Sequence, residues 1–258
     1  MEVCALTGNK DYLQYSIDWA DYNQWKGATS NNKAEWRSTY GESPEYVLFG
    51  DWQVCFQTYA DLYKLDPDTI KIARAREVME YQMSTSKLDY WHWVDALYMV
   101  MPVMVKMYDI TKNPLYLEKL HQYLTVTDSI MYDREVGLYY RDAKYPYPFH
   151  KTINGKKDFW SRGDGWAFAA FAKVLKQLPA EDKYREEYIT RFQTMAKSIA
   201  ACQQPEGYWT RSLIDPEQAP GPETSGTALF TYGFLWGINN GLLNADIYSP
   251  IVEKAWNY

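Results

Sequence analysis

The chain has 258 residues, of which 33 are acidic and 27 basic, and its formal net charge is −6. This acidic balance argues against nucleic-acid binding, because the phosphate backbone attracts clustered Lys and Arg, and no apolar run reaches the roughly 18 residues of a membrane span. With 47% hydrophobic and 23% charged residues the composition is that of a globular protein, and the length predicts a single domain over residues 1–258.

Two kinds of helical segment alternate along the chain. Segments of the first kind are apolar on nearly every side, as helices buried on every side are, whereas segments of the second kind are amphipathic and have one wet face. The four apolar segments are 51–65, 91–104, 163–175 and 224–239. The more polar segments that follow them are, in the same order, 67–83, 114–131, 181–202 and 245–256. Alternating inner and outer helices predict an all-α fold, an α/α toroid with two concentric layers.

The segment 132–161 interrupts this alternation. It is long and contains several Gly and Pro residues, but its many Tyr and Phe side chains argue against disorder. Because long loops inside compact domains are usually functional or disordered, we expect a functional loop. Residues 138–145 and 156–160 are candidates for a hairpin around Asn154-Gly155, a dipeptide that favours tight turns.

Three carboxylates are candidates for chemistry. Asp95 is the sole charge of its apolar segment, and a buried carboxylate is costly unless it is paired or faces a solvent-filled pit. Asp142 lies in the aromatic loop beside Tyr140 and Arg141, which are candidates for binding substrate. The structural alternative for Asp142 is an Asp at the end of a hairpin. Asp51 opens an inner helix, where the structural alternative is a helix N-cap.

The string Trp160-Ser-Arg-Gly-Asp-Gly-Trp166 is the densest cluster of candidate binding residues. Arg162 has a planar guanidinium that matches a carboxylate bidentately, and Trp160 and Trp166 offer flat walls for a sugar ring. Asp164 lies between two glycines at the start of an inner helix, where free N–H groups favour an anion. These features suit an acidic sugar, and the alternative is a Gly-rich helix start with structural tryptophans.

Aromatic residues make up 17% of the chain, which suits sugar stacking as well as core filling. Trp91, His92 and Trp93 are adjacent, and all three are candidates for lining the pit and binding substrate. Neither the three histidines nor the three cysteines have the spacing of a metal site or a disulfide framework, so we expect no cofactor and no metal.

Several segments together resemble the unsaturated rhamnogalacturonyl hydrolases of glycoside hydrolase family 105 and the related family 88 unsaturated glucuronyl hydrolases. These segments are DWQVCFQTYADLY (51–63), YWHWVDALYMVMPVM (90–104), GLYYRDAKY (137–145), FWSRGDGWAFAAFAKVL (159–175) and ETSGTALFTYGFLWGINNGLL (223–243). The middle residue of the Trp-Arg-Gly-x-Gly-Trp string is commonly Asn in the family and is Asp164 here. The family usually carries paired aspartates where this chain has residues 51–63.

The resemblance implies an (α/α)6 barrel in a bacterial enzyme that needs no metal. It implies hydrolysis of an unsaturated galacturonyl residue at the non-reducing end of oligosaccharides derived from rhamnogalacturonan, a pectin. Carried over by motif, Asp142 is the general acid/base and Asp95 its partner, while Trp160, Arg162 and Trp166 line the uronate pocket. A second carboxylate close by favours the protonated form of the acid.

Other readings stay open at this point. The substrate can be another unsaturated uronide of the glucuronyl type, or the protein can be a non-catalytic binder of acidic glycans. The chain begins without a signal-peptide pattern, and cytoplasm and periplasm are both compatible with it. Periodicity gives about nine helices against twelve in the family barrel, so we expect a barrel that is incomplete at both ends.

Overall fold

The structure is a computed structural model that describes residues 2–258. Its backbone forms two compact units, each described by itself below. Unit 1 runs to Tyr90 and resumes over Met99–Tyr123, and unit 2 comprises Trp91–Tyr98 and Leu124–Tyr258. Two long helices, α6 (Asp95–Thr111) and α7 (Leu115–Met131), contribute residues to both units.

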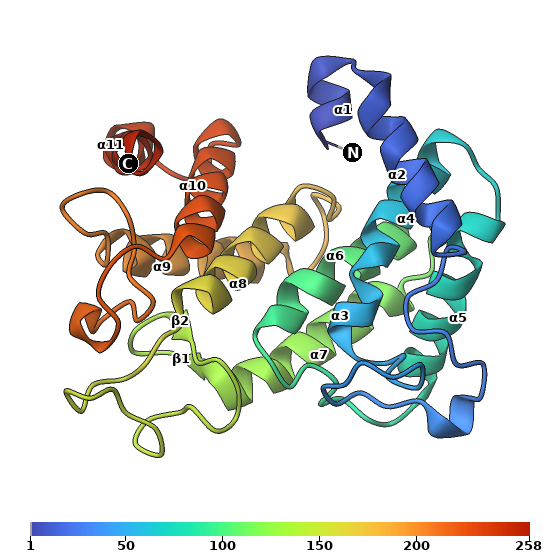
Figure 1. Ribbon diagram of the computed structural model, residues 1–258, viewed down its shortest axis with the longest axis horizontal. Coiled ribbons are helices and arrows are strands. Elements are labelled where there is room, and N and C mark those ends of the chain that lie inside the picture. Colours follow the sequence, from blue (N-terminus) through green and yellow to red (C-terminus); the bar gives the residue numbers. More distant parts are fainter. Residues whose placement is uncertain (1) are drawn as a thin grey trace. The chain divides into compact units, whose positions relative to one another are not determined.

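Unit 1 is built around α4, which contacts α2 and α5 (Figure 1). Its elements are α1 (Glu2–Thr7), α2 (Lys10–Tyr22), the short 3₁₀ turn η1 (Lys33–Glu35), α3 (Gly50–Gln53), α4 (Cys55–Leu65) and α5 (Ile70–Ser84). Phe56, Tyr59 and Leu62 of α4 are buried, as the apolar pattern of this segment predicts. Helices α1 and α2 were not predicted, because their described side chains are largely exposed and form no long apolar stripe.

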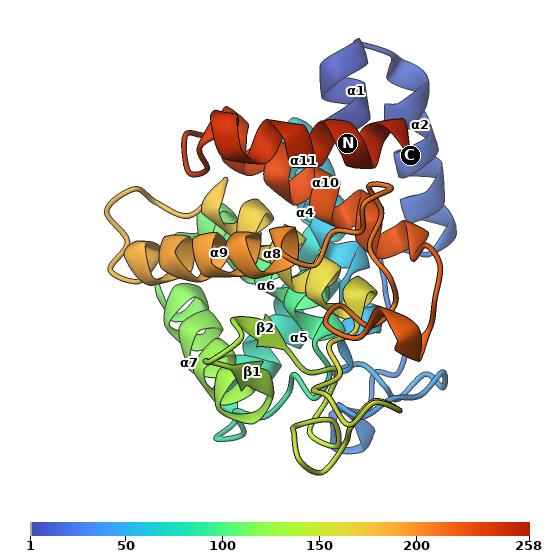
Figure 2. The same ribbon diagram turned by 90° about the vertical axis from the view of Figure 1, so that its left-hand side faces the viewer.

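Unit 2 contains β1 (Tyr132–Asp133), β2 (Leu138–Tyr139), α8 (Ser161–Leu175), α9 (Arg185–Ala200), the 3₁₀ turn η2 (Pro216–Gln218), α10 (Thr224–Asn239) and α11 (Ala245–Asn257). Helix α8 packs against both α9 and α10, and α10 packs against α11 (Figure 2). A Cβ atom at Gly233 would lie 2.4 Å from the ring of Phe168, so α10 approaches α8 closely at this glycine. The predicted alternation is confirmed here: α8 is buried on nearly every side, and α9 has one exposed face.

The predicted hairpin is wrong in its pairing. Strand β2 pairs with β1 instead, in the register Tyr132 with Tyr139 and Asp133 with Leu138. Gly137, with φ of +78°, allows the tight return between these strands because it adopts a left-handed backbone without steric cost. Residues 159–160 pair with 212–213, a segment too distant in sequence for a local hairpin signal.

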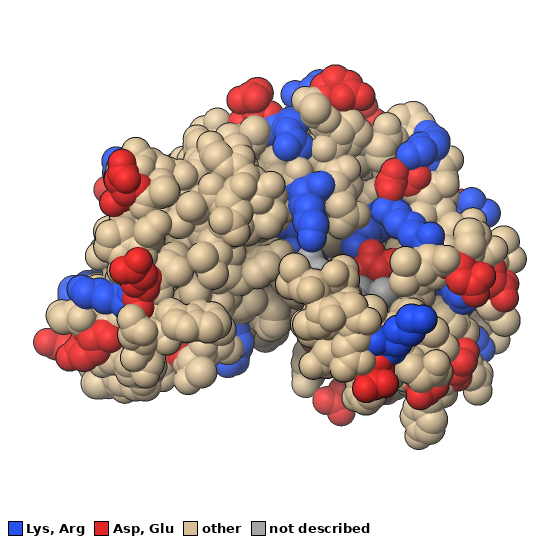
Figure 3. Space-filling model, turned by 90° about the horizontal axis from the view of Figure 1, so that it is seen from above, with Lys and Arg blue, Asp and Glu red and all other residues tan. Residues whose placement is uncertain are grey.

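Two properties of the structure bear on membranes and nucleic acids as partners. Within residues 2–258 the structure has no helix that is both long and apolar enough to cross a bilayer. On the face shown in Figure 3, Lys and Arg side chains are interspersed with Asp and Glu rather than gathered in one basic stripe.

Candidate active site

The two predicted acids are brought onto neighbouring backbone segments of unit 2. Asp142 lies opposite Trp93 in an isolated antiparallel bridge, and the N–H of Val94 donates to the carbonyl of Arg141 at 3.0 Å. Asp95 follows two residues after Trp93 as the first residue of α6. The loop that carries Asp142 is therefore fixed to the strand-like segment that leads into Asp95.

The carboxylate of Asp142 is buried and held through both of its oxygens. Nε and Nη2 of Arg141 each lie 2.8 Å from Oδ2, and the backbone N–H of Lys144 donates to Oδ1 at 2.8 Å. The bond from Lys144 is an Asx turn, the local role that Asp favours at turns. The local turn role of Asp142 is thus observed, and its predicted catalytic role stays a prediction.

Three predicted residues lie at the start of α6 or in the segment just before it. Trp91 is buried, whereas His92 and Asp95 are half-buried. Asp95 lies in the first turn of α6, where the helix dipole stabilises a negative charge. The predicted roles of these three residues at the substrate stay predictions.

The two glycines of the Trp-Ser-Arg-Gly-Asp-Gly-Trp string allow the start of α8 to pack tightly. A Cβ at Gly163 would lie 2.8 Å from Cγ1 of Val94, and a Cβ at Gly165 would lie 3.0 Å from Cβ of Leu229 on α10. A side chain at Gly163 would force the side chain of Val94, the ring of Trp160 or the start of α8 to shift. The string therefore has a packing role in addition to its predicted binding role.

Asp164 is fully buried inside unit 2. Its Oδ1 accepts a hydrogen bond of 2.8 Å from the backbone N–H of Tyr139, which joins the start of α8 to β2. Its Oδ2 is buried and has no hydrogen-bond partner among residues 2–258. Burial raises the pKa of Asp164 well above its usual range. The observed contacts are structural, and its predicted contact with substrate stays a prediction.

Arg162, unlike Asp164, reaches the surface of unit 2. Its guanidinium carbon lies 4.4 Å from the ring centroid of Trp160, and its Nη1 lies 3.7 Å from Oε1 of Glu223. The side chain of Arg162 is 45% exposed, so its planar fork remains accessible to a ligand. Trp166 is half-buried, with its ring centroid 4.6 Å from that of Tyr98. Trp160 and Arg162 thus form one stacked, accessible pair at the start of α8.

Tyr140 was predicted to bind substrate, and the structure places its side chain in the interior of unit 2. Its hydroxyl donates to Oδ2 of Asp133 at 2.7 Å, and its ring stacks on Phe159 with centroids 4.7 Å apart. Lys157 also pairs with Asp133 at 2.7 Å. Through Asp133, these contacts connect β1 to Tyr140 near the start of the aromatic loop and to Lys157 near its end.

Asp51, in unit 1, is the second residue of α3 and is exposed. The residue at the N-cap of α3 is Phe49, so Asp51 does not fill the capping role that was its structural alternative. Partial desolvation raises the pKa of Asp51. Asp51 lines a cavity of about 420 Å³ together with Tyr40, Gly41, Glu42, Phe49 and Trp52.

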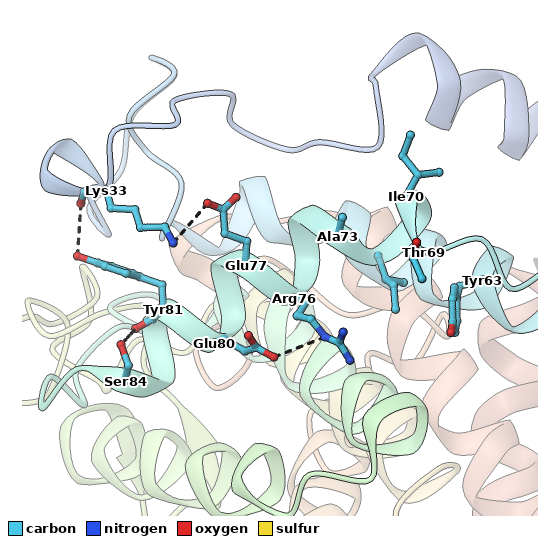
Figure 4. Close-up of a pocket in the computed structure, with 11 residues that line it drawn as sticks. Lys33, Tyr63, Thr69, Ile70, Ala73, Arg76, Glu77, Glu80, Tyr81 and Ser84 are labelled. Carbon is cyan, nitrogen blue, oxygen red and sulfur yellow. Dashed lines mark hydrogen bonds and ion pairs between the residues drawn. The ribbon is translucent and has the colours of Figure 1, made fainter.

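A cavity of about 700 Å³ lies along α5 of unit 1 (Figure 4). The lining side chains of opposite charge pair with each other, Lys33 with Glu77 at 3.4 Å and Arg76 with Glu80 at 3.5 Å. None of the residues predicted for catalysis or binding lines this cavity.

One cluster beside the predicted site was not identified from the sequence. Both carboxylate oxygens of Asp158 accept from Nη1 of Arg211, at 2.6 and 2.7 Å, and Nε2 of His150 lies 2.9 Å from Oδ2. Burial raises the pKa of Asp158, but the hydrogen bonds from Arg211 and His150 outweigh it and leave this pKa below its usual range. No spacing rule connects residues 53 positions apart such as Asp158 and Arg211, so the sequence offered no signal for the pair. Over residues 2–258, no group of three or more His, Cys, Asp or Glu side chains is arranged to hold a metal ion.

The model of Glycosyl Hydrolase Family 88 matches residues 1–258. The chain belongs to this family. The resemblance seen in the sequence is thereby confirmed.

Two curated relatives are named unsaturated 3S-rhamnoglycuronyl hydrolase. The one from Alteromonas sp. (strain LOR) is 36% identical over 65% of this chain and 40% of its own length, and the one from Formosa agariphila is 37% identical over 67% and 47%. The matched region therefore spans less than half the length of either relative.

Solved structures extend the comparison. A protein described as a polysaccharide lyase is 70% identical, with a TM-score of 0.99 over 100% of this chain and 73% of its own. A glycoside hydrolase of family 105 from C. acetobutylicum ATCC 824 is 21% identical, with a TM-score of 0.76 over 99% of this chain and 72% of its own. The second likeness concerns the fold alone, and it confirms the predicted α/α-barrel fold class.

Proposed function

We propose that this protein hydrolyses oligosaccharides that end in an unsaturated (4,5-dehydro) uronyl residue linked to rhamnose, and releases that residue. Family membership and the names of the two curated relatives support the reaction class. The single observation that carries the proposal is the bridge that fixes buried Asp142 opposite Trp93, beside the segment that leads into Asp95.

The chemistry assigns the proton transfers to Asp142. The substrate carries an enol ether between C4 and C5 that is conjugated with its carboxylate. Protonated Asp142 gives its proton to C4, water adds at C5, and the carboxylate then takes the proton that the water loses. The resulting hemiketal opens and expels the neighbouring sugar. The reaction does not occur at the anomeric carbon, so the carboxylate-spacing rule for retaining and inverting glycosidases does not apply.

The stacked pair at the start of α8 supplies the binding of the uronate. The exposed guanidinium of Arg162 offers a planar fork to the sugar carboxylate, and Trp160 holds that guanidinium in place from one side. Glu223, 3.7 Å away, is too distant for a close hydrogen-bonded pair, so Arg162 retains donors for an incoming carboxylate.

The test follows the ultraviolet absorbance of the conjugated double bond during incubation with lyase-generated disaccharides. The proposal predicts that the absorbance falls with the wild-type chain. Asp142→Asn should abolish turnover and retain ligand binding, whereas Asp89→Asn, a matched change at an exposed aspartate, should behave as wild type. Turnover by the wild type that requires a metal ion, and is lost when the metal is removed, would contradict the proton-transfer mechanism.

The identity of the uronyl residue is part of the same test. The assay uses two substrates, a disaccharide with unsaturated galacturonyl linked to rhamnose and a disaccharide with unsaturated glucuronyl linked to rhamnose. We propose the galacturonyl compound as the first substrate, on the resemblance to the rhamnogalacturonyl hydrolases. Faster decay of the glucuronyl compound would transfer the assignment to the glucuronyl type.

A second candidate function is a polysaccharide lyase, because the 70% identical structure is described as one. The same assay distinguishes a lyase from a hydrolase, because the two activities change the absorbance in opposite directions. A lyase creates the conjugated double bond from an intact polysaccharide, so the absorbance rises, whereas the proposed hydrolase consumes it. A non-catalytic binder changes the absorbance of neither substrate and binds equally well after Asp142→Asn.

A further inference from the structure

Arg141 reaches the carboxylate of its own neighbour, Asp142. Successive side chains of an extended backbone point to opposite sides, and Asp142 is extended enough to form the bridge with Trp93. The guanidinium must therefore fold back to place both Nε and Nη2 at 2.8 Å from Oδ2. Such a geometry needs further contacts that hold the guanidinium.

Two aromatic rings supply those contacts. The guanidinium carbon of Arg141 lies 4.1 Å from the ring centroid of Tyr145 and 4.7 Å from that of Trp93. Both distances are within the range of a cation–π contact. The ring of Tyr145 is the nearer of the two, and it reaches this position through a turn in which the N–H of Tyr145 donates to the carbonyl of Asp142 at 3.0 Å.

Tyr145 is in turn held by contacts with residues other than Arg141. Its ring centroid lies 4.1 Å from that of His150, and His150 pairs with buried Asp158 at 2.9 Å. Arg211 holds Asp158 through both oxygens. A continuous set of contacts thus connects Asp142, through Arg141 and Tyr145, to the segment that pairs with Trp160.

We infer that Tyr145 is a positioning residue that acts through Arg141 to orient the carboxylate of Asp142. The inference rests on the proposed function for its kinetic consequence and on geometry alone for its structural one. Tyr145→Phe keeps the ring and both of its ring contacts, whereas Tyr145→Leu removes them. Phe149→Leu, a change at an 88% exposed ring of the same loop, is the control for loop disturbance.

The first measurement separates kcat from KM on the unsaturated disaccharide. We expect Tyr145→Leu to lower kcat by about tenfold, in line with the loss of a cation–π contact, with little change in KM. Tyr145→Phe should restore kcat to near the wild-type value, and Phe149→Leu should not change it. A Leu variant with wild-type kcat, or a Phe variant as impaired as the Leu variant, overturns the inference.

The second measurement is a crystal structure of Tyr145→Leu, which does not depend on turnover. We expect the guanidinium of Arg141 to leave Oδ2 of Asp142 while the Trp93–Asp142 bridge persists. A guanidinium that stays at hydrogen-bond distance in the variant refutes the positioning role. If the wild type leaves every unsaturated uronide unchanged, the proposed function fails by itself, and this structure alone decides the inference. If Tyr145→Leu does not fold, a structure of Tyr145→Met, which fills a similar volume without an aromatic ring, replaces it and is read by the same criterion.

Discussion

The backbone N–H of Tyr139 donates a hydrogen bond of 2.8 Å to Oδ1 of Asp164, 25 residues further along the chain. This bond joins β2 to the first turn of α8, and Tyr139 precedes Asp142 by three residues. The chain that leads to the Asp142 loop is therefore held by the fully buried carboxyl group of Asp164, in which Oδ1 accepts a hydrogen bond and Oδ2 has no partner among residues 2–258.

Asp164→Asn should make the protein less sensitive to rising pH. Burial raises the pKa of Asp164 in the folded chain, so this group contributes stability that is complete below the pKa of the unfolded chain, about 4. That stability is lost as the pH rises toward the folded pKa. Asn keeps an oxygen acceptor for Tyr139 and has no proton to lose.

Thermal melts between pH 4 and pH 8 measure this effect. The melting temperature of Asp164→Asn, relative to the wild type, should increase as the pH rises. Asp89→Asn, a change at an exposed residue, should give a curve parallel to that of the wild type. A parallel curve for Asp164→Asn would show that Asp164 is ionised in the folded chain throughout this range.

Gly163→Ala should destabilise unit 2. The new Cβ would lie 2.8 Å from Cγ1 of Val94 and 2.9 Å from Cε3 of Trp160, and overpacking of this kind costs about 1–3 kcal/mol. Gly165→Ala meets its nearest atom at 3.0 Å, on Leu229, and should cost less. Urea unfolding of both variants measures the free energies of unfolding. A Gly165 variant that is the less stable of the two contradicts this ranking.

The helices of unit 2 were the most predictable part of the fold. Helix α10 begins and ends at the residues expected from its charge-free run, Thr224–Asn239, and α8 covers the expected Gly163–Leu175 with two more residues at its start. Uniform burial and one-sided amphipathicity are properties of a local sequence window, so they can be read without knowledge of tertiary contacts. Helices α1 and α2 lack such a pattern and were not predicted.

The site was predictable as a set of residue types and not as a set of contacts. The motifs directed attention to Asp142 and Arg162, but Asp164 and Tyr140, predicted at the substrate, make their observed contacts inside the protein. The cluster around Asp158 was not predicted, because its partner Arg211 comes from a segment 53 residues away. Long-range pairing of this kind, like the true partner of β2, depends on how the chain returns and has no local signature.

Arg191→Met should be among the more destabilising changes in unit 2. Nη1 of Arg191 lies 2.7 Å from Oδ2 of Asp128 and donates to the hydroxyl of Tyr139 at 2.7 Å, and that hydroxyl donates to Oδ1 of Asp128 at 2.6 Å. Both charged side chains are buried, so removal of one leaves the other without its partner, at a cost of about 3–5 kcal/mol.

A double variant tests whether the unpaired charge causes this cost. Arg191→Met combined with Asp128→Leu removes both charges and should be more stable than Arg191→Met alone, because no isolated carboxylate remains buried. Denaturant unfolding of the wild type, Arg191→Met, Asp128→Leu and the double variant gives the coupling free energy. Costs that simply add would mean that the two side chains contribute independently.

Arg162→Lys should weaken substrate binding with little effect on turnover. Lysine keeps the positive charge but loses the planar fork and the stack on Trp160, and charge-assisted hydrogen bonds of the kind lost are each worth enough to raise KM roughly 10- to 100-fold. Because Arg162 is proposed to bind the uronate in the ground state and the transition state alike, kcat should change little. Steady-state kinetics on the unsaturated disaccharide measure both constants, with Arg134→Lys, at an exposed arginine, as the matched control. A KM within twofold of the wild-type value would remove Arg162 from the uronate pocket and leave the carboxylate of the substrate to another cation of the chain.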